Sequence, residues 1–324
     1  MENQCYIGCN PVKIAYEWHL NDKHGSAMRK SERLHLHYTE LYRKRHKLIE
    51  VFFQPRVTIK DLIHALKKGY LYYVYNREAP NSSNIILECF DFASEYDDIR
   101  YILFAYTCPT AFSKIINTNM AKNTYHELRL YCTPLNCIVL AHTQDGIQVF
   151  LSLMYHPSLD QFVCKCPLTV YRGAVIHNPK LLLEGYENGS TIITTTFLST
   201  SLENDVADIY SQRNLADSNE VSLFCTYHLH NERRRTALNL TEISKFSDEN
   251  EILIYPYVPF QIDIIKTLHD GKRIEVVLSE LMETVDDSVH YESIRAGDAT
   301  VSWILNVTPK QKDIIILEKE NVFP

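Results

Sequence analysis

The chain has 324 residues, of which 45% are hydrophobic and 23% are charged, and its net charge is −7. These values are typical of a globular protein and exclude a largely disordered one. The chain has only 9 glycines, and it lacks the glycine-rich patterns of Rossmann and P-loop nucleotide sites. The acidic surplus disfavours a general nucleic-acid binder. The length predicts about two domains.

No apolar run approaches the roughly 20 residues that a membrane-spanning helix needs. The first twenty residues contain no basic segment followed by an apolar core, so we expect no secretory signal. The nine cysteines are an odd number spread along the chain, which favours free thiols in a reducing compartment. Cys164 and Cys166 lack a second ligand pair at zinc-like spacing. We therefore expect a cytoplasmic protein without a metal.

The first predicted element is basic. Residues 23–47 contain eight Lys or Arg and two Glu, and apolar residues at helical intervals indicate an amphipathic helix at 29–47. Its basic side is either a solvated face or a contact for an anionic partner. A second helix is predicted from Thr58, as N-cap, to Gly69, just beyond its end. The polar stretch 77–84 then closes an N-terminal extension, residues 1–85.

The pattern from 86 to 160 is helical, and after Pro167 short β-branched and aromatic runs appear. These predicted strands are residues 168–175, 191–201, 221–229, 249–255, 260–268 and 273–281. The last two flank His-Asp-Gly at 269–271, which predicts a hairpin. Helices followed by strands without helical crossovers predict an α+β fold, with an antiparallel or mixed sheet within 167–282. Residues 286–324 form a C-terminal tail.

Two of the predicted strands carry side chains suited to ligand binding. Arg172 has a guanidinium fork that can bind phosphate bidentately, and Gly173 would let a ligand approach the backbone closely. On a strand, Phe197, Ser199 and Ser201 share one face, where hydroxyl groups can bond a ribose or hold a carboxylate. A surface arginine and a solvated strand edge are the structural alternatives.

A third stretch contains two carboxylates. Glu249 and Glu251 precede the apolar run Ile-Leu-Ile, and on a strand both side chains would point to one side, roughly 6.5 to 7 Å apart. Like charges this close are costly unless a cation or substrate lies between them, and such pairs are typical of acid/base sites. The alternative is an acidic turn before a strand.

In this order, the three stretches resemble the R-S-E class of mono-ADP-ribosyltransferases, the arginine-specific group related to vertebrate ecto-enzymes and clostridial binary toxins. YRG at 171–173 resembles the first motif of that family, and FLSTS at 197–201 resembles its Ser-Thr-Ser strand. EISKFSDENEILIYPYVPFQI at 242–262 resembles its final motif, and FAYTCPTAFSKIIN at 104–117 resembles part of its helical region. The resemblance implies a catalytic domain at 86–285 with a two-sheet ADP-ribosyltransferase core.

The resemblance also implies an activity: transfer of ADP-ribose from NAD, or NADP, to arginine side chains of a protein, with release of nicotinamide. Glu251 would bond the ribose 2′-hydroxyl and stabilise the cationic ribosyl group. Ser199 would orient Glu251, and Arg172 would hold the diphosphate or the nearby ribose. Glu249 would position the incoming guanidinium and accept its proton, because that group arrives protonated.

Four further positions follow from the same resemblance. Gly173 and Thr200 would belong to the NAD site, Tyr210 would stack on the nicotinamide, and Phe246 would meet the protein substrate. No metal is implied. One alternative is an NAD glycohydrolase that uses water as the acceptor in the same site. Another is an inactive fold that binds a partner through the basic helix, against which the intact set of arginine, serine and glutamate argues.

Overall fold

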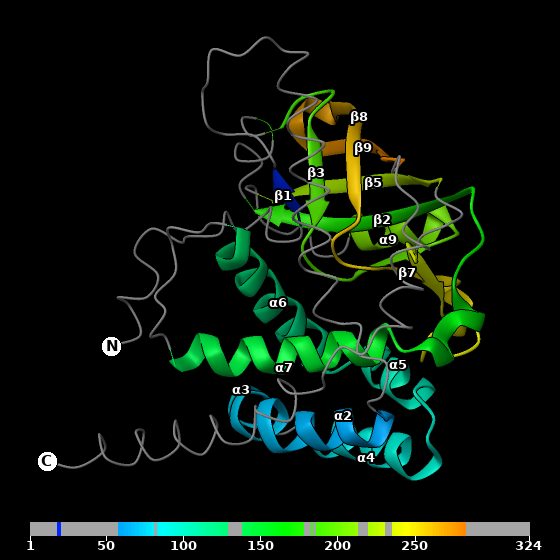
Figure 1. Cartoon of the computed structure of the whole chain (residues 1–324). Helices are drawn as coiled ribbons and strands as arrows, with labels where there is room; N and C mark the ends of the chain where they lie inside the picture. Colours follow the sequence, from blue (N-terminus) through cyan, green and yellow to red (C-terminus); the bar gives the residue numbers. More distant parts are fainter. Residues whose placement is uncertain are drawn as a thin grey trace, which may run out of the picture. The chain divides into compact units, whose positions relative to one another are not determined.

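The computed structural model describes residues 18–20, 58–80, 83–128, 138–177, 183, 186–212, 220–230 and 235–282. It contains two compact units, one helical and one rich in strands, and the chain passes from the first to the second near residue 160 (Figure 1). The predicted basic helix at 29–47 and the tail at 286–324 lie outside the described residues. Within the described part, no helix is long and apolar enough to cross a membrane, and no group of side chains is arranged to hold a metal.

The helical unit is built around packed aromatic rings. Its elements are α2 (Ile59–Leu66), η1 (Lys67–Tyr75), α3 (Asn76–Glu78), α4 (Ser83–Tyr96), α5 (Arg100–Thr107), α6 (Phe112–Leu128), α7 (Ile138–Met154) and η4 (Pro157–Phe162). The ring of Phe112 is fully buried and makes edge-on contacts with Tyr75, Phe90 and Phe150. Such contacts between buried rings stabilise the unit beyond the apolar area that they bury.

Helix α2 begins as predicted but does not end as predicted. The hydroxyl of Thr58 accepts a hydrogen bond from the Asp61 amide at 3.2 Å, and Asp61 bonds back to the Thr58 amide, which forms a capping box. The predicted end at Gly69 is wrong, because the chain continues in π-helical form to Tyr75. Gly69, Tyr70 and Tyr75 are buried there, so core packing outweighs the low helix propensity of glycine.

The predicted boundary between residues 85 and 86 does not separate two units. Helix α4 runs across it from Ser83 to Tyr96, and the Phe112 ring contacts both Tyr75, before the boundary, and Phe90, after it. The helices on either side of the predicted boundary therefore belong to one core. The helices at 86–160 belong with those at 58–80, and the strands form a unit of their own.

The second unit is a mixed β-sheet, so the predicted α+β fold is confirmed. Its strands are β1 (Trp18–Leu20), β2 (Leu168–His177), β3 (Thr191–Thr194), β4 (Leu198–Ser201), β5 (Glu220–Leu229), β6 (Ala237–Asn239), β7 (Glu251–Ile254), β8 (Pro259–Leu268) and β9 (Arg273–Glu280). The described strands pair in the order β1-β3-β8-β9-β5-β2-β4-β7-β6, and β5 and β9 are the parallel neighbours. A single pair, Tyr171 with Ser201, links β2 to β4, so the described strands form one continuous sheet, where the resemblance implied two.

Most of the predicted strands occur, with two differences. The hairpin at His269–Gly271 is confirmed, and it joins the antiparallel strands β8 and β9. The predicted strand 191–201 is two strands, because its first part pairs with β8 and its last part pairs with β7. Strands β1 and β6 were not predicted; each has three residues, too few for a periodic pattern.

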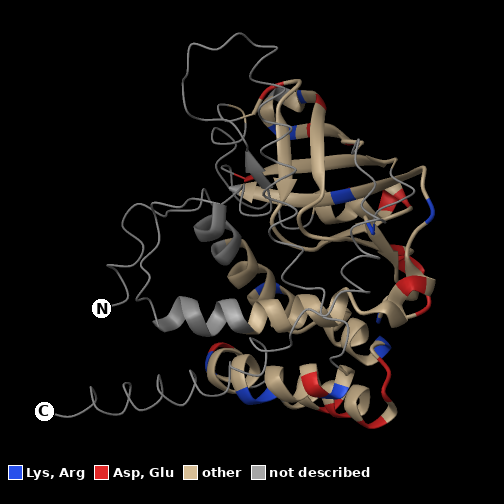
Figure 2. Cartoon of the chain, in the orientation of Figure 1, with Lys and Arg blue, Asp and Glu red and all other residues tan. Residues whose placement is uncertain are grey.

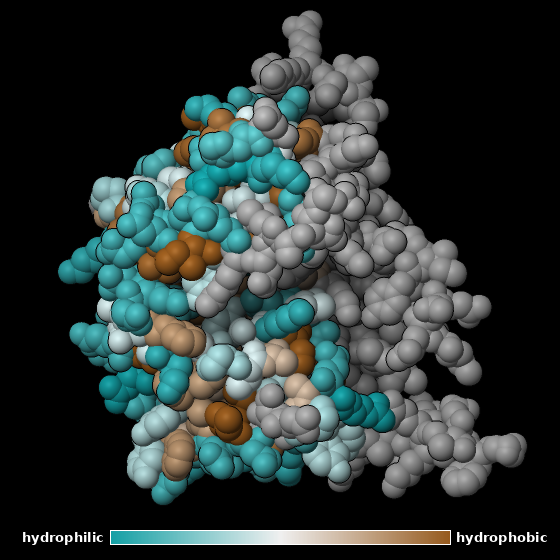
Figure 3. Space-filling view, turned by 180° about the vertical axis from the view of Figure 1, so that it is seen from behind, coloured by the Kyte–Doolittle hydropathy of each residue, from teal (hydrophilic) through white to brown (hydrophobic). Residues whose placement is uncertain are grey.

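The described surface mixes charges and has small apolar areas. Basic and acidic residues are interspersed along both units in Figure 2. On the face shown in Figure 3, hydrophilic residues predominate, and the brown hydrophobic residues lie in small separate groups.

Helix α9 (Asn204–Gln212) packs against β2 at Gly173 (Figure 1). A Cβ atom at Gly173 would lie 1.7 Å from the carbonyl oxygen of Ala207 and 2.6 Å from the amide nitrogen of Ser211. The absence of a side chain at Gly173 therefore allows α9 to pack closely on β2. The sequence analysis explained this glycine by the close approach of a ligand. Its place beside Arg172 remains the reason to associate it with the site.

Replacing Gly173 by alanine is expected to lower the free energy of unfolding by roughly 1 to 3 kcal/mol, because overpacking forces backbone to move. Here the atoms in the way belong to the backbone of α9, which has no side-chain rotamer through which to relax. Urea denaturation followed by far-UV circular dichroism measures the change. A variant whose stability lies within about 0.5 kcal/mol of the parent protein would contradict this packing.

Candidate active site

The pairing of β4 with β7 brings three of the predicted side chains to one face. Glu251 is directly opposite Ser201, and Ser199 is opposite Leu253. Because side chains alternate along a strand and Ser199 lies two residues from Ser201, the side chains of Ser199, Ser201 and Glu251 share a face. Strand β2, which carries Arg172, is the next neighbour of β4.

Glu251 is a buried carboxylate, 6% exposed, held by two serines. Ser199 Oγ donates to Oε1 at 2.7 Å, and Ser244 Oγ donates to Oε2 at 2.7 Å. Burial raises the pKa of Glu251 above its ordinary value, and the nearby charge of Glu249 raises it further, whereas the two serine hydroxyls and the charge of Arg172 lower it. The serines thus fix the direction of the carboxylate and favour its ionised form.

The Arg172 side chain reaches from β2 to the backbone of β4 at Ser199. Its Nη1 atom donates to the carbonyl oxygen of Ser199 at 2.7 Å, and its positive charge acts on Glu251. The guanidinium is therefore part of the same assembly as the buried carboxylate. The three members predicted from the sequence, Arg172, Ser199 and Glu251, come together in the folded chain.

Glu249 reaches the site by a different route from the one expected. It ends the short helix η5 (Ser247–Glu249), and Asn250 has a left-handed backbone with φ of 47° before β7 begins at Glu251. The prediction that both carboxylates point to one side of a single strand is therefore wrong. Tyr210 OH donates to Glu249 Oε1 at 2.7 Å, and Ser201 Oγ donates to the Glu249 carbonyl at 2.6 Å. A turn, rather than a strand, holds the second carboxylate near the first.

The remaining predicted positions differ in what they face. Thr200 is buried on the other face of β4, and its hydroxyl donates to the Ile252 carbonyl at 2.6 Å, so its side chain does not point with Ser199. Tyr210 lies on α9 and contacts Glu249 as described. Phe246 lies just before η5 and is 39% exposed.

Sequence reasoning did not single out Ser244. It lies seven residues before Glu251, within the stretch compared with the final family motif. A glutamate that begins an apolar strand must find hydrogen-bond donors when it is buried, and a serine in the preceding turn is a natural source. This need for hydrogen-bond donors was the signal from which Ser244 could have been found. Ser201, which was placed on the correct face, binds the backbone of Glu249.

The arrangement is suited to stabilising a positive charge. A fixed, buried carboxylate can act on a cation that develops beside it, and it needs no reorganisation to do so. A second carboxylate nearby, less deeply buried, can hold a cationic acceptor and take a proton from it. An arginine in the same assembly can bind an anionic group of the substrate.

The chain matches no family model and no curated protein. Among solved structures it is similar to the Vis toxin, an ADP-ribosyltransferase from Vibrio splendidus (17% identity, 64% of this chain and 88% of that chain, TM-score 0.37). It is also similar to exoenzyme S from Pseudomonas aeruginosa, solved with human 14-3-3 protein beta and carba-NAD (15% identity, 71% and 96%, TM-score 0.39). A third is Plx2a, an ADP-ribosyltransferase toxin from Paenibacillus larvae (16% identity, 61% and 96%, TM-score 0.39). At these values the similarities assign neither a family nor an activity to this chain.

Proposed function

We propose that this protein is a mono-ADP-ribosyltransferase that moves ADP-ribose from NAD to arginine side chains of proteins. One observation carries the proposal: Glu251 is buried and held at both oxygens by Ser199 and Ser244, with Arg172 bonded to the same strand. These residues occur in the order and spacing that resemble the R-S-E transferases. No metal is required by the chemistry proposed.

The reaction needs a negative charge more than it needs an acid. Nicotinamide leaves NAD as a neutral pyridine, so positive charge builds up on the ribose, as it does on the sugar in glycoside hydrolysis. Glu251 supplies a fixed anion for that charge, and its two serine partners keep it oriented. Each oxygen accepts one serine hydroxyl and retains a second lone pair, with which one of them can accept a ribose hydroxyl.

Arginine is a demanding acceptor. Its guanidinium remains protonated at physiological pH, so it is a poor nucleophile until a base takes a proton. Glu249 lies close enough to Glu251 to influence its pKa, and its carboxylate is oriented by Tyr210. We assign to Glu249 the positioning of the acceptor guanidinium and the removal of its proton. Phe246, exposed on the preceding turn, is the residue that would meet the protein substrate.

Replacing Arg172 by lysine is expected to weaken NAD binding about tenfold, because lysine keeps the charge but loses the planar fork that grips phosphate. The same change removes the bond from Nη1 to the Ser199 carbonyl. Isothermal titration calorimetry measures the NAD affinity, and the melting temperature reports on the fold. If affinity is unchanged, Arg172 serves to brace β4 and does not contact the dinucleotide.

The proposal is tested with the purified chain, labelled NAD and a free guanidino compound such as agmatine. Mass spectrometry should detect ADP-ribosylated guanidine together with some free ADP-ribose, and NADP in a parallel reaction tests the second dinucleotide. Free ADP-ribose without the adduct would identify an NAD glycohydrolase. If neither product forms, the enzymatic proposal is overturned. The protein would then be a binding module, for which the basic segment 29–47 is the predicted contact.

A further inference from the structure

Helix α9 carries two polar side chains on opposite flanks of its buried stripe. Ala207 and Ser211, four residues apart, are buried against the sheet, and Ile209, on the other side, is 61% exposed. At 100° per residue, Asp208 and Tyr210 fall about 80° to either side of the middle of that stripe. Each flank residue has a partner on a different part of the sheet unit.

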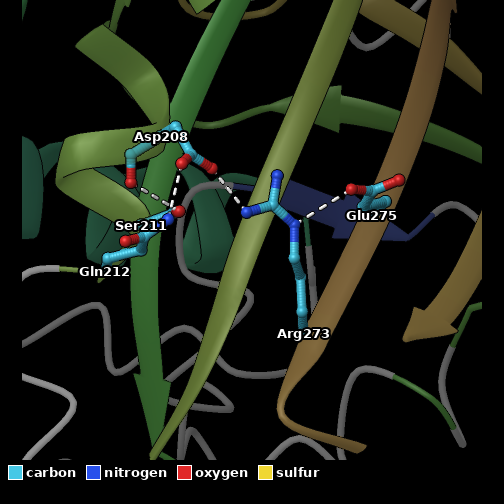
Figure 4. A network of polar contacts seen from close by, with 5 residues as sticks. All are labelled: Asp208, Ser211, Gln212, Arg273 and Glu275. Atoms are coloured by element: carbon cyan, nitrogen blue, oxygen red, sulfur yellow. Dashed lines mark hydrogen bonds and ion pairs between the residues drawn. The ribbon is translucent and has the colours of Figure 1, made fainter. Parts of the chain in front are cut away.

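On one flank, Tyr210 contacts Glu249, the carboxylate proposed to bind the acceptor arginine. Tyr210 OH donates to Glu249 Oε1 at 2.7 Å. The Asp208 flank is held by Arg273 of β9, whose Nη1 donates to Asp208 Oδ1. Figure 4 shows Arg273 reaching from β9 across the intervening strand to α9, with Asp208 on one side and Glu275 on the other. Gln212 Nε2 adds a bond to the second oxygen of Asp208.

Arg273 is itself fixed in place. Its Nε atom donates to Glu275 Oε1 at 2.9 Å, and its guanidinium carbon lies 4.9 Å from the centre of the Phe224 ring. Its side chain is 18% exposed. An ion pair whose arginine is shielded and bracketed in this way is screened less, and loses less side-chain entropy on forming, than a pair on an open surface.

The contact between α9 and β2 gives these flanks a role. The helix packs on Gly173, which offers no side chain to interlock with the helix surface. The hydrogen bonds of Tyr210 and Asp208 add a polar contact on each flank and oppose rotation of the helix about its axis. A helix turned away from Arg273 would carry the Tyr210 hydroxyl away from Glu249.

We propose that Tyr210 and Arg273 are positioning residues for Glu249: α9, anchored by Arg273, holds the Tyr210 hydroxyl against the carboxylate that receives the acceptor. The two residues thereby set how much ADP-ribose passes to arginine and how much passes to water. This inference rests on the proposed function. Cleavage of the nicotinamide bond belongs to Glu251 and needs neither the Tyr210 hydroxyl nor Arg273.

The test compares products of purified full-length variants given NAD and agmatine. Tyr210→Phe removes only the hydroxyl, and the ratio of agmatine adduct to free ADP-ribose should fall on the order of tenfold, the effect of one hydrogen bond to a charged group. Hydrolysis without agmatine should fall less than adduct formation, because phenylalanine keeps the aromatic ring that the resemblance places on the nicotinamide and loses only the hydroxyl. Arg273→Met should lower the ratio about threefold, and Arg273→Lys, which retains a cation for Asp208, should restore most of it.

Two controls separate positioning from general damage. Adding Tyr210→Phe to Glu249→Gln should change the ratio no further, because Tyr210 acts through Glu249. Arg100→Met removes an exposed ion pair with Asp98 in the helical unit and should leave the ratio unchanged. The inference is overturned if Tyr210→Phe leaves the ratio unchanged, or if adduct and ADP-ribose fall together at an unaltered melting temperature. If the parent protein forms neither product, the proposed function itself fails and the inference falls with it.

Discussion

Replacing Glu251 by glutamine is expected to reduce both arginine modification and NAD hydrolysis by about 10²-fold or more, because it removes a charge that acts mainly in the transition state. The change is isosteric, and the Ser199 and Ser244 hydroxyls can still donate to the remaining amide oxygen or rotate. Nicotinamide release, followed by liquid chromatography, measures both reactions together.

The matched control is Glu187→Gln, which removes an exposed carboxylate from a turn of the same unit and should leave turnover unchanged. NAD affinity should persist in Glu251→Gln, because the ground state contains no ribosyl cation. Turnover near that of the parent protein would remove Glu251 from the chemistry and with it the proposed site.

Replacing Glu249 by glutamine is expected to abolish most arginine modification, about 10²-fold, while NAD hydrolysis stays within severalfold of the parent protein. Glu249 lies on the turn before β7 and is bonded to Tyr210, so it can serve an acceptor without touching the bond that breaks. The two products, adduct and free ADP-ribose, are measured in one reaction by mass spectrometry.

The outcome separates the proposed transferase from its alternatives. An equal fall in both products would mean that Glu249 supports Glu251 or the fold, and arginine specificity would lose its main support. No change in either product would make Glu249 an acidic turn residue, as one interpretation of the sequence allowed, and would favour the hydrolase.

The sequence predicted which residues form the site better than it predicted the backbone geometry that brings them together. Arg172, Ser199 and Glu251 could be named because strand alternation and motif order are local properties of the chain. The position of Glu249 could not be derived in this way, because the left-handed backbone at Asn250 ends the strand pattern and nothing in the period-two signal shows it. Ser244 required knowledge that Glu251 is buried.

The sequence also could not show which distant segments of the chain pack together. Gly173 was assigned to a ligand because a glycine beside an arginine permits close approach, and only the fold shows that the approaching group is α9. The same holds for residues 77–84, whose polar composition predicted a domain boundary although the helices on either side share the Phe112 cluster. Composition reports local exposure and cannot report which helices share a core.

The most direct test of the central claim is the rate of nicotinamide release from NAD by the parent protein, Glu249→Gln and Glu251→Gln, each with and without agmatine. We expect release by the parent protein in both conditions, with adduct formed when agmatine is present. Glu249→Gln should release nicotinamide without forming adduct, and Glu251→Gln should do neither. Release by Glu251→Gln at the rate of the parent protein would contradict the assignment of bond cleavage to the buried carboxylate.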